Sequence, residues 1–222
     1  TFYPAGHGKG AVLNKISTDG GLTWGESLES TPKSWKNSRE TPTVYRLEFA
    51  GGKTSDKLIM ISANPKWPRE STTGGFNCSI SCDEGKTWSE FELFYDKESD
   101  GGVVPIVAMS SLTRLKENGE FVDKWMGLFH DADFYNYKTI LTFDENGKMQ
   151  WSKPEKYFSA YRNIEKESNM CEVEVIRSEE GKGDELCLIS RSNSKKVNSL
   201  ISFSNDEGKT WSKPVFAPAA LN

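Results

Sequence analysis

Residues 81–88 read Ser81-Cys82-Asp83-Glu84-Gly85-Lys86-Thr87-Trp88. Similar stretches occur at residues 17–24, 142–151 and 204–211, of which the middle one is degraded. The aspartates of the four copies lie 64, 61 and 62 residues apart along the chain. A period of this length indicates one supersecondary unit that is repeated and that buries its apolar face only by stacking on its neighbours.

The motif has the composition of a tight turn between two strands. Its aspartate is expected to accept hydrogen bonds from backbone amides two residues on, and its glycine to supply a positive φ. Its tryptophan is expected to bury the ring against the sheet, with the indole N–H free to reach a carbonyl. The residues before each intact copy alternate apolar and polar, as in a strand. We therefore predict that the motif residues hold hairpins together and carry no chemistry; they are Asp19, Trp24, Asp83, Trp88, Asp144, Trp151, Asp206 and Trp211.

The pattern S-x-D-x-G-x-T-W resembles the Asp-boxes, or BNR repeats, of the sialidase (neuraminidase) superfamily. The resemblance covers essentially the whole chain and implies an all-β fold, a six-bladed β-propeller of four-stranded antiparallel blades. Asp-boxes also occur in propellers that cleave no sialic acid. An activity therefore has to be argued from residues outside the boxes.

The repeat divides the 222 residues into units of about 62, roughly 1–35, 36–100, 101–160 and 161–222. This is about three and a half blades, and since the chain does not begin with Met we expect a fragment of a larger protein. Each full unit is predicted to run through a first strand, a Gly-bearing turn, a second strand, the box strand, the box and a fourth strand, without a helix. First strands are predicted at 41–47, 106–112 and 172–176, and second strands at 57–61, 124–129 and 185–189.

Composition narrows the function classes. With 36% hydrophobic residues and no long apolar run, the chain shows neither a transmembrane helix nor a signal peptide, so no membrane partner is expected. The net charge of −4, with Lys and Arg scattered, gives no basic stripe for nucleic acid. The four cysteines fit no zinc spacing, and we predict free thiols, no metal and no organic cofactor; Cys171 facing Cys187 across a hairpin is the alternative. A secreted or cell-surface location is compatible with this sequence, and the oligomeric state stays open.

The strand order separates two ends of each sheet. The box joins the third and fourth strands, so it shares one end with the turn between the first two strands. The other end, called the site end below, carries the start of the first strand and the exit of the second. Charged and aromatic residues gather there in a combination that suits an anionic sugar. The substrate-binding candidates are Arg39, Glu40, Trp67, His130, Asp133 and Asn193, together with His7 in a glycine-rich loop.

Two of these segments resemble part of a sialidase site. In that family a Glu opens a first strand, and an Arg closes the second strand after the hairpin. Residues 169–172 and 188–191 resemble this pattern, with a turn three residues longer. The resemblance implies that Glu172 polarises a tyrosine nucleophile, which at a free pKa of about 10 needs an adjacent base. It implies that Arg191 is one of three arginines that grip the substrate carboxylate. The alternative is a hairpin with an edge Glu and a solvated Arg.

The general acid departs from the family pattern. It should fall shortly before the first box, where residues 6–10 contain no carboxylate. His7 would take a related role, or Asp131 or Asp133 would supply the acid in a different arrangement. In the second unit Thr41 stands where the family has Asp before the proline, and Glu40 is displaced by one residue, which points it to the other side of the strand.

These observations predict an exo-α-sialidase-like glycoside hydrolase that acts on sialylated glycans, with Glu172, Arg191 and Asp131 as catalytic residues. A non-catalytic propeller that binds glycans or proteins is the first alternative. A propeller hydrolase for another sugar is the second.

Overall fold

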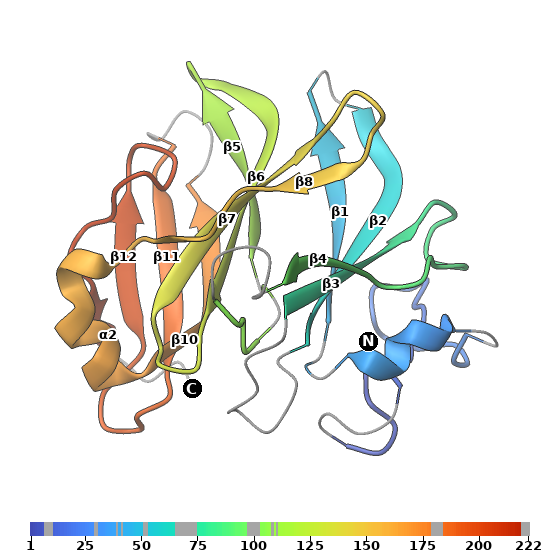
Figure 1. The fold of residues 1–222 in the computed structure, drawn as a ribbon, viewed down its shortest axis with the longest axis horizontal. Coiled ribbons are helices and arrows are strands. Elements are labelled where there is room, and N and C mark those ends of the chain that lie inside the picture. Colours follow the sequence, from blue (N-terminus) through green and yellow to red (C-terminus); the bar gives the residue numbers. More distant parts are fainter. Residues whose placement is uncertain are drawn as a thin grey trace. The chain divides into compact units, whose positions relative to one another are not determined.

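The computed structural model describes residues 1–6, 11–28, 31–38, 40, 42–50, 53–64, 75–96, 103–107, 109, 111–178 and 184–218. The chain forms two compact units, Thr1–Ala108 and Met109–Asn222. Each sheet is antiparallel and is built from strands that are neighbours along the chain, as the ribbon in Figure 1 shows. The predicted all-β architecture of four-stranded antiparallel sheets is confirmed.

The first unit contains one sheet in the order β1 (Thr43–Phe49), β2 (Lys53–Asn64), β3 (Gly75–Ser81) and β4 (Glu92–Asp96). The 3₁₀ turn η1 (Lys33–Asn37) precedes the sheet. Its Trp35 is fully buried with Val12 and Met60, and its ring meets that of Trp88 edge-on at 5.8 Å. The box tryptophan thus anchors the segment before the sheet to the sheet itself.

The second unit contains two sheets. The first runs β5 (Leu112–Glu117), β6 (Glu120–His130), β7 (Asn136–Phe143) and β8 (Met149–Trp151), with the short β9 (Glu155–Lys156) also paired to β7. The second runs β10 (Met170–Arg177), β11 (Leu186–Ser192), β12 (Leu200–Ser204) and β13 (Val215–Phe216). The turn η2 (Ser159–Tyr161) and the helix α2 (Arg162–Ser168) connect them.

The core of the second unit lies between these two sheets. Met126 and Leu128 of β6 are buried in one cluster with Val173 and Val175 of β10 and with the box residue Trp211. Burial of this much apolar side chain is the main stabilising term for such a unit. Sheets that stack face to face in chain order are what the repeat period predicts.

The boxes form nearly identical hydrogen-bonded turns. In the copy at 81–88, Asp83 Oδ1 accepts from Thr87 N at 2.8 Å and Oδ2 accepts from Thr87 Oγ1 at 2.5 Å. Ser81 Oγ accepts from Gly85 N at 2.9 Å and donates to Asp83 at 2.8 Å. The prediction that the aspartate bonds amides two residues on is wrong for the intact copies, because its amide partner is four residues on. The same bonds recur around Asp19 and Asp206.

The predictions about the box glycine and tryptophan have different outcomes. Gly85 has a φ of 81°, and the residue before it, Glu84, is left-handed as well with a φ of 61°. Trp88 donates its indole N–H to the Gly85 carbonyl at 3.0 Å. Trp24, however, is 60% exposed, so burial of the ring is not general.

Several element predictions are corrected. Two 3₁₀ turns and the helix α2 occur where no helix was expected. The strand predicted at 106–112 begins only at Leu112. Residues 11–16 form isolated bridges instead of a strand.

The cysteines are free thiols, as predicted. Cys171 is opposite Arg191, and Cys187 is opposite Ile176, so the two do not face each other across the hairpin. Burial raises the pKa of the Cys171 thiol to about 11, and Glu172 adds to this shift. Within the described ranges, no helix is long and apolar enough to cross a membrane.

The two ends of the sheets are separated as the strand order predicts. In the first unit Arg46 of β1 forms an ion pair with Glu84 of the box at 2.5 Å. In the second unit Arg177, the last residue of β10, forms an ion pair with box residue Glu207 at 2.6 Å. The exit of β6 at His130, the start of β10 at Met170 and the exit of β11 at Ser192 lie at the site end.

Candidate functional site

A β-bulge at the start of β10 places Glu172 at the site end. The register along β11 shifts between Cys171 and Val173, so Glu172 is the extra residue of the bulge. Its φ of 46° lies in the left-handed region, which costs a residue with a Cβ about 1–2 kcal/mol. Bulges of this kind re-aim a side chain out of the alternating pattern of the strand. The carboxylate of Glu172 is thereby turned toward the exit of the neighbouring strand.

Arg191 meets that carboxylate at the exit of β11. Its Nη1 donates to both Glu172 oxygens at 2.8 Å, and Nη2 donates to Asn193 Oδ1 at 3.3 Å. The side chains of Glu172 and Arg191 are 40% and 43% exposed, so solvent reaches the pair. The hydrogen bond and the charge of Glu172 raise the pKa of Arg191. The structure therefore brings together three of the predicted site residues.

The loop between β6 and β7 is closed by Asp131. Its Oδ1 accepts from the backbone N–H groups of Asp133 and Tyr135, both at 2.9 Å, and its Oδ2 accepts from Tyr137 Oη at 3.1 Å. Two hydrogen bonds from its own loop and one from β7 give this carboxylate a clear structural role. The assignment of general-acid work to Asp131 stays a prediction, and so does the role of Asp133, which is exposed.

His130 is the last residue of β6 and is 5% exposed. Its Nδ1 lies 2.8 Å from the Asp131 carbonyl oxygen, which requires the hydrogen to be on Nδ1. The imidazole also stacks on Phe134, with ring centroids 5.5 Å apart and an interplanar angle of 8°. His130 is thus held firmly beneath the loop.

The helix α2 clamps this loop from behind. Arg162 donates to the carbonyl oxygens of Asp133 at 2.7 Å and Phe134 at 2.9 Å, and its guanidinium lies 3.5 Å from the centroid of the Tyr135 ring. Its Nη1 is also 3.6 Å from the Oε2 of Glu165. A guanidinium that binds two carbonyls and stacks on a ring fixes both the position and the orientation of the loop.

Glu165 is a buried carboxylate in the same network, with only 1% of its surface exposed. Its Oε1 accepts from the backbone N–H of Asn136 at 3.0 Å and from Asn136 Nδ2 at 3.1 Å. Burial raises the pKa of Glu165, against the lowering effect of these hydrogen bonds. Asn136 Nδ2 also lies within 3.3 Å of the Met170 carbonyl oxygen. This side chain therefore ties the loop after β6 to the start of β10, two residues before Glu172.

Sequence reasoning missed Arg162, Glu165 and Asn136. The helix α2 is short and has no capping side chain, so its sequence contains little signal for a helix. The high density of charged residues at 162–168 is the one feature of the sequence that distinguishes this segment. Glu40 belongs to the first unit and is buried there, and its carbonyl oxygen accepts from Ser38 Oγ at 2.9 Å. His7, Arg39 and Trp67 lie outside the described residues.

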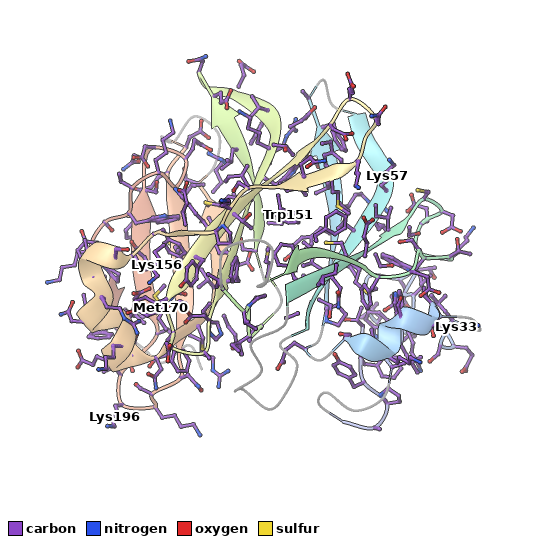
Figure 2. All side chains as sticks on the ribbon, in the orientation of Figure 1. Lys33, Lys57, Trp151, Lys156, Met170 and Lys196 are labelled. Atoms are coloured by element: carbon purple, nitrogen blue, oxygen red, sulfur yellow. The ribbon has the colours of Figure 1, made fainter. Side chains whose placement is uncertain are left out.

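In the part of the chain that the structure describes, no group of three or more His, Cys, Asp or Glu side chains is placed to hold a metal ion. A shallow hollow of about 700 Å³ lies beside α2 at the site end, lined by Asn163, Lys166, Glu167, Asn169, Ser194 and Lys196. Figure 2 labels Lys196 on the loop that follows β11, where its side chain extends away from the ribbon. The hollow is bordered only by polar and charged side chains, which suits a hydrated ligand or solvent.

No protein-family model and no curated protein matches the chain. Among solved structures, the chain is similar to the exo-β-1,3-galactanase of Phanerochaete chrysosporium in a structure with β-1,3-galactotriose, with 11% identity and a TM-score of 0.57; 95% of this chain and 44% of that chain are covered. A protein of unknown function from Dyadobacter fermentans has 17% identity and a TM-score of 0.54, with 95% and 59% covered. A Trypanosoma rangeli sialidase has 14% identity and a TM-score of only 0.47, with 79% and 29% covered, a fit too loose to bear on fold or function.

The chain thus spans about half the length of the galactanase and of the Dyadobacter fermentans protein. Identities this low bear on the fold alone. The structural similarity to the galactanase and the antiparallel sheets in chain order together identify the fold as part of a β-propeller. The six-blade count stays a prediction.

Proposed function

We propose that the protein is a glycoside hydrolase of the sialidase type, which removes terminal sialic acid from glycoconjugates at the site end of these sheets. The observation that carries the proposal is the bulge at Glu172. This residue has a left-handed backbone conformation, and its Oε1 lies 2.8 Å from Arg191 Nη1. Strained backbone persists where the surroundings over-determine it, and such positions cluster at functional sites. A hairpin with an ordinary edge Glu would need no such strain.

The pair has the chemistry that an anionic sugar requires. Guanidinium binds carboxylate through charge-assisted hydrogen bonds, and the half-exposed Arg191 is open to a second carboxylate from the substrate. Binding of the substrate would share or replace the contact with Glu172. The released carboxylate would then serve as the base beside a tyrosine nucleophile, and the Arg would remain charged throughout. Sialidases are exceptions to the usual pair of catalytic carboxylates, since their nucleophile is a Tyr.

The clamped loop from His130 to Asn136 supports the same proposal. A binding site needs side chains that are held by a second layer of contacts, because a loosely held group loses its geometry. Arg162 and Glu165 supply that layer from α2. His130 and Asp133 are the residues of this loop that we assign to substrate contact, and Asn193 is assigned to it from the neighbouring sheet.

Release of 4-methylumbelliferone from its sialic acid conjugate by the full-length protein tests the proposal. We expect turnover in the wild type and its loss in Glu172→Gln, in which the base is removed at nearly constant shape. Glu84→Gln is the matched control, because Glu84 is also left-handed and paired with an arginine but belongs to an Asp-box. Equal turnover in Glu172→Gln and Glu84→Gln would contradict the assignment of Glu172.

A hydrolase for a neutral sugar is the second candidate. The ion pair favours this candidate, because the charge of Arg191 is already balanced by the carboxylate of Glu172 and needs no anionic substrate. The galactanase to which the chain is similar was crystallised with a neutral galactotriose. Hydrolysis of β-1,3-galactotriose without cleavage of the sialic acid conjugate would select this candidate. Sugar binding without turnover of either substrate would instead indicate a non-catalytic binding propeller.

A further inference from the structure

A second cavity lies at the opposite end of the second unit, beside the Asp-box at residues 204–211. It has a volume of about 960 Å³ and is formed between the face of the β5–β8 sheet and the box turn that follows β12. Ligand pockets in proteins typically occupy about 300–1,000 Å³, so this cavity is large enough for an extended small molecule. None of the residues assigned to the site at Glu172 lines it.

The floor of the cavity is apolar. Leu115 of β5 and Ile140 of β7 line the cavity, and Met126 of β6 lies beneath them. Met126 is fully buried in the core, whereas Leu115 and Ile140 cover that core only in part and keep some apolar surface open. Trp151, at the end of β8 and labelled in Figure 2, borders the cavity, but it is paired with Leu141, so its side chain lies on the opposite face of the sheet from Ile140 and Thr142. Apolar surface of this kind supports the face of a ligand.

The charges around this floor are mostly paired with one another. Lys116 Nζ is 2.7 Å from Asp184 Oδ2, and Lys124 Nζ is 2.5 Å from Glu117 Oε1. Lys138 Nζ donates to the Gly208 carbonyl oxygen at 3.1 Å across the cavity wall. A strongly charged ligand would have to break these contacts and compete with their partners. The cavity therefore favours a ligand that is neutral but rich in hydrogen-bonding groups.

The remaining polar groups are side chains on a sheet face. Thr142 and Gln150 are cross-strand partners of β7 and β8, and both line the cavity. Peptides that bind sheets usually pair with the backbone of an open strand edge. Here β6 and β7 are paired on both sides. At the outer edge of β5, the Lys116 N–H donates to Glu207 and the Arg114 carbonyl accepts from Arg177, so a ligand meets mainly side-chain donors and acceptors. Hydroxyl groups on a ring with an apolar face match this lining.

We propose that this cavity is a non-catalytic binding site for a neutral oligosaccharide. The sugar rings lie against Leu115 and Ile140, and their hydroxyls bond to Thr142, Gln150 and the paired charges. The proposal does not depend on the reaction assigned to Glu172, because the cavity is at the other end of the sheets. A propeller with such a site would hold a glycan at one end independently of what occurs at the other.

The test is binding of the full-length protein to an array of immobilised neutral, sialylated and sulfated oligosaccharides. It is carried out in the Arg191→Ala background so that the site end contributes little. The strongest neutral oligosaccharide found is then titrated by calorimetry. Thr142→Trp fills the cavity from a half-exposed strand position, and Glu145→Trp places the same ring on an exposed turn outside the lining.

We expect at least one neutral oligosaccharide to bind, with affinity reduced tenfold or more by Thr142→Trp and unchanged by Glu145→Trp. Gln150→Ala, at an exposed position that leaves the core intact, should weaken the same binding severalfold and guards against a folding defect in the tryptophan variant. Binding confined to sialylated or sulfated sugars, no binding to any neutral sugar, or equal binding by both tryptophan variants would overturn the proposal.

Discussion

The guanidinium of Arg191 donates from a single nitrogen, Nη1, to both carboxylate oxygens of Glu172 at 2.8 Å. Such a contact leaves Nη2 free for Asn193 and leaves the plane of the guanidinium accessible to solvent. A surface pair of this exposure contributes about 0–1 kcal/mol to stability. The left-handed backbone conformation of Glu172 costs about 1–2 kcal/mol, which is at least as much as the ion pair contributes. The stability of the ion pair alone therefore does not explain the bulge.

The strain at Glu172 predicts an unusual order of stability. Glu172→Gly and Glu172→Ala both lose the ion pair, but only glycine adopts the φ of 46° without a steric cost. Glu172→Gly should therefore be more stable than Glu172→Ala by about 1 kcal/mol. Denaturant unfolding of the two variants measures this difference.

Glu174, two residues further along β10, is exposed and has no left-handed φ, so it serves as the control. There the order should reverse, with the glycine variant about 0.5–1 kcal/mol less stable than the alanine variant. Glycine variants that are less stable at both positions would show that the bulge is not strained.

The Asp-box aspartates predict a loss of stability in acid. The Thr87 hydroxyl, followed by the Thr87 amide, holds the pKa of Asp83 at about 2, and Thr23 does the same for Asp19. A pKa below the unfolded value of about 3.9 means that the aspartate stabilises the fold above that pH. This contribution is lost as the pH falls from about 4 toward about 2. The melting temperature of Asp83→Asn should therefore lie below that of the wild type at pH 6 and approach it at pH 2.

Thr87→Val tests the physical cause of this shift. It removes the hydroxyl donor that lies 2.5 Å from Asp83 Oδ2 and keeps a side chain of similar size. The pKa of Asp83 should rise toward its usual value, and the acid-dependent part of the stability should shrink. A steep acid dependence that persists in Thr87→Val would contradict the role given to the hydroxyl.

Two box glycines separate backbone strain from crowding. Gly208 and Gly147 have φ values of 73° and 74°, so alanine is strained at both positions by about 1 kcal/mol. At Gly208 a Cβ would also lie 2.6 Å from Met126 Sδ, whereas nothing lies within 4 Å at Gly147. Overpacking should add about 1–3 kcal/mol to the loss of stability in Gly208→Ala. Equal losses in the two variants, measured by urea unfolding, would show that Met126 moves aside without cost.

The clamp on the loop after β6 predicts that charge alone does not replace Arg162. Lysine keeps the positive charge but cannot donate to two carbonyls while stacking on Tyr135. Hydrogen exchange of residues 131–137 should therefore become faster in Arg162→Lys. Lys166→Ala, on the same helix, is the control and should leave exchange unchanged. Full protection of the loop in Arg162→Lys would show that Asp131 closes it without help from α2.

The boxes could be predicted from the sequence because their contacts are local. Every bond from Asp83 goes to a residue between Ser81 and Thr87, so eight residues contain the whole turn. The strand predicted at 106–112 was wrong for the opposite reason. Ile106 and Met109 are buried, but they belong to no strand. An apolar run in the sequence does not distinguish a buried strand from a buried segment without strand pairing.

The candidate site was predictable only in part. The positions of Glu172 and Arg191 followed from a resemblance, and the structure places them in contact. The bulge that brings them together contains no glycine, so the sequence gives no local sign of it. The helix α2 is held by Glu165 and Arg162 through contacts with residues about 30 positions away. Such tertiary contacts leave no local pattern in a single sequence.

The most direct test of the central claim is kcat/KM for the 4-methylumbelliferyl conjugate of sialic acid in Arg191→Ala and Arg46→Ala variants of the full-length protein. Both arginines are partly exposed and paired with a glutamate, but Arg46 lies at the Asp-box end. Loss of a charge-assisted contact worth about 1.5–3 kcal/mol should lower kcat/KM about 10- to 100-fold in Arg191→Ala and leave Arg46→Ala unchanged. A value for Arg191→Ala equal to that of the wild type would contradict the assignment of the site.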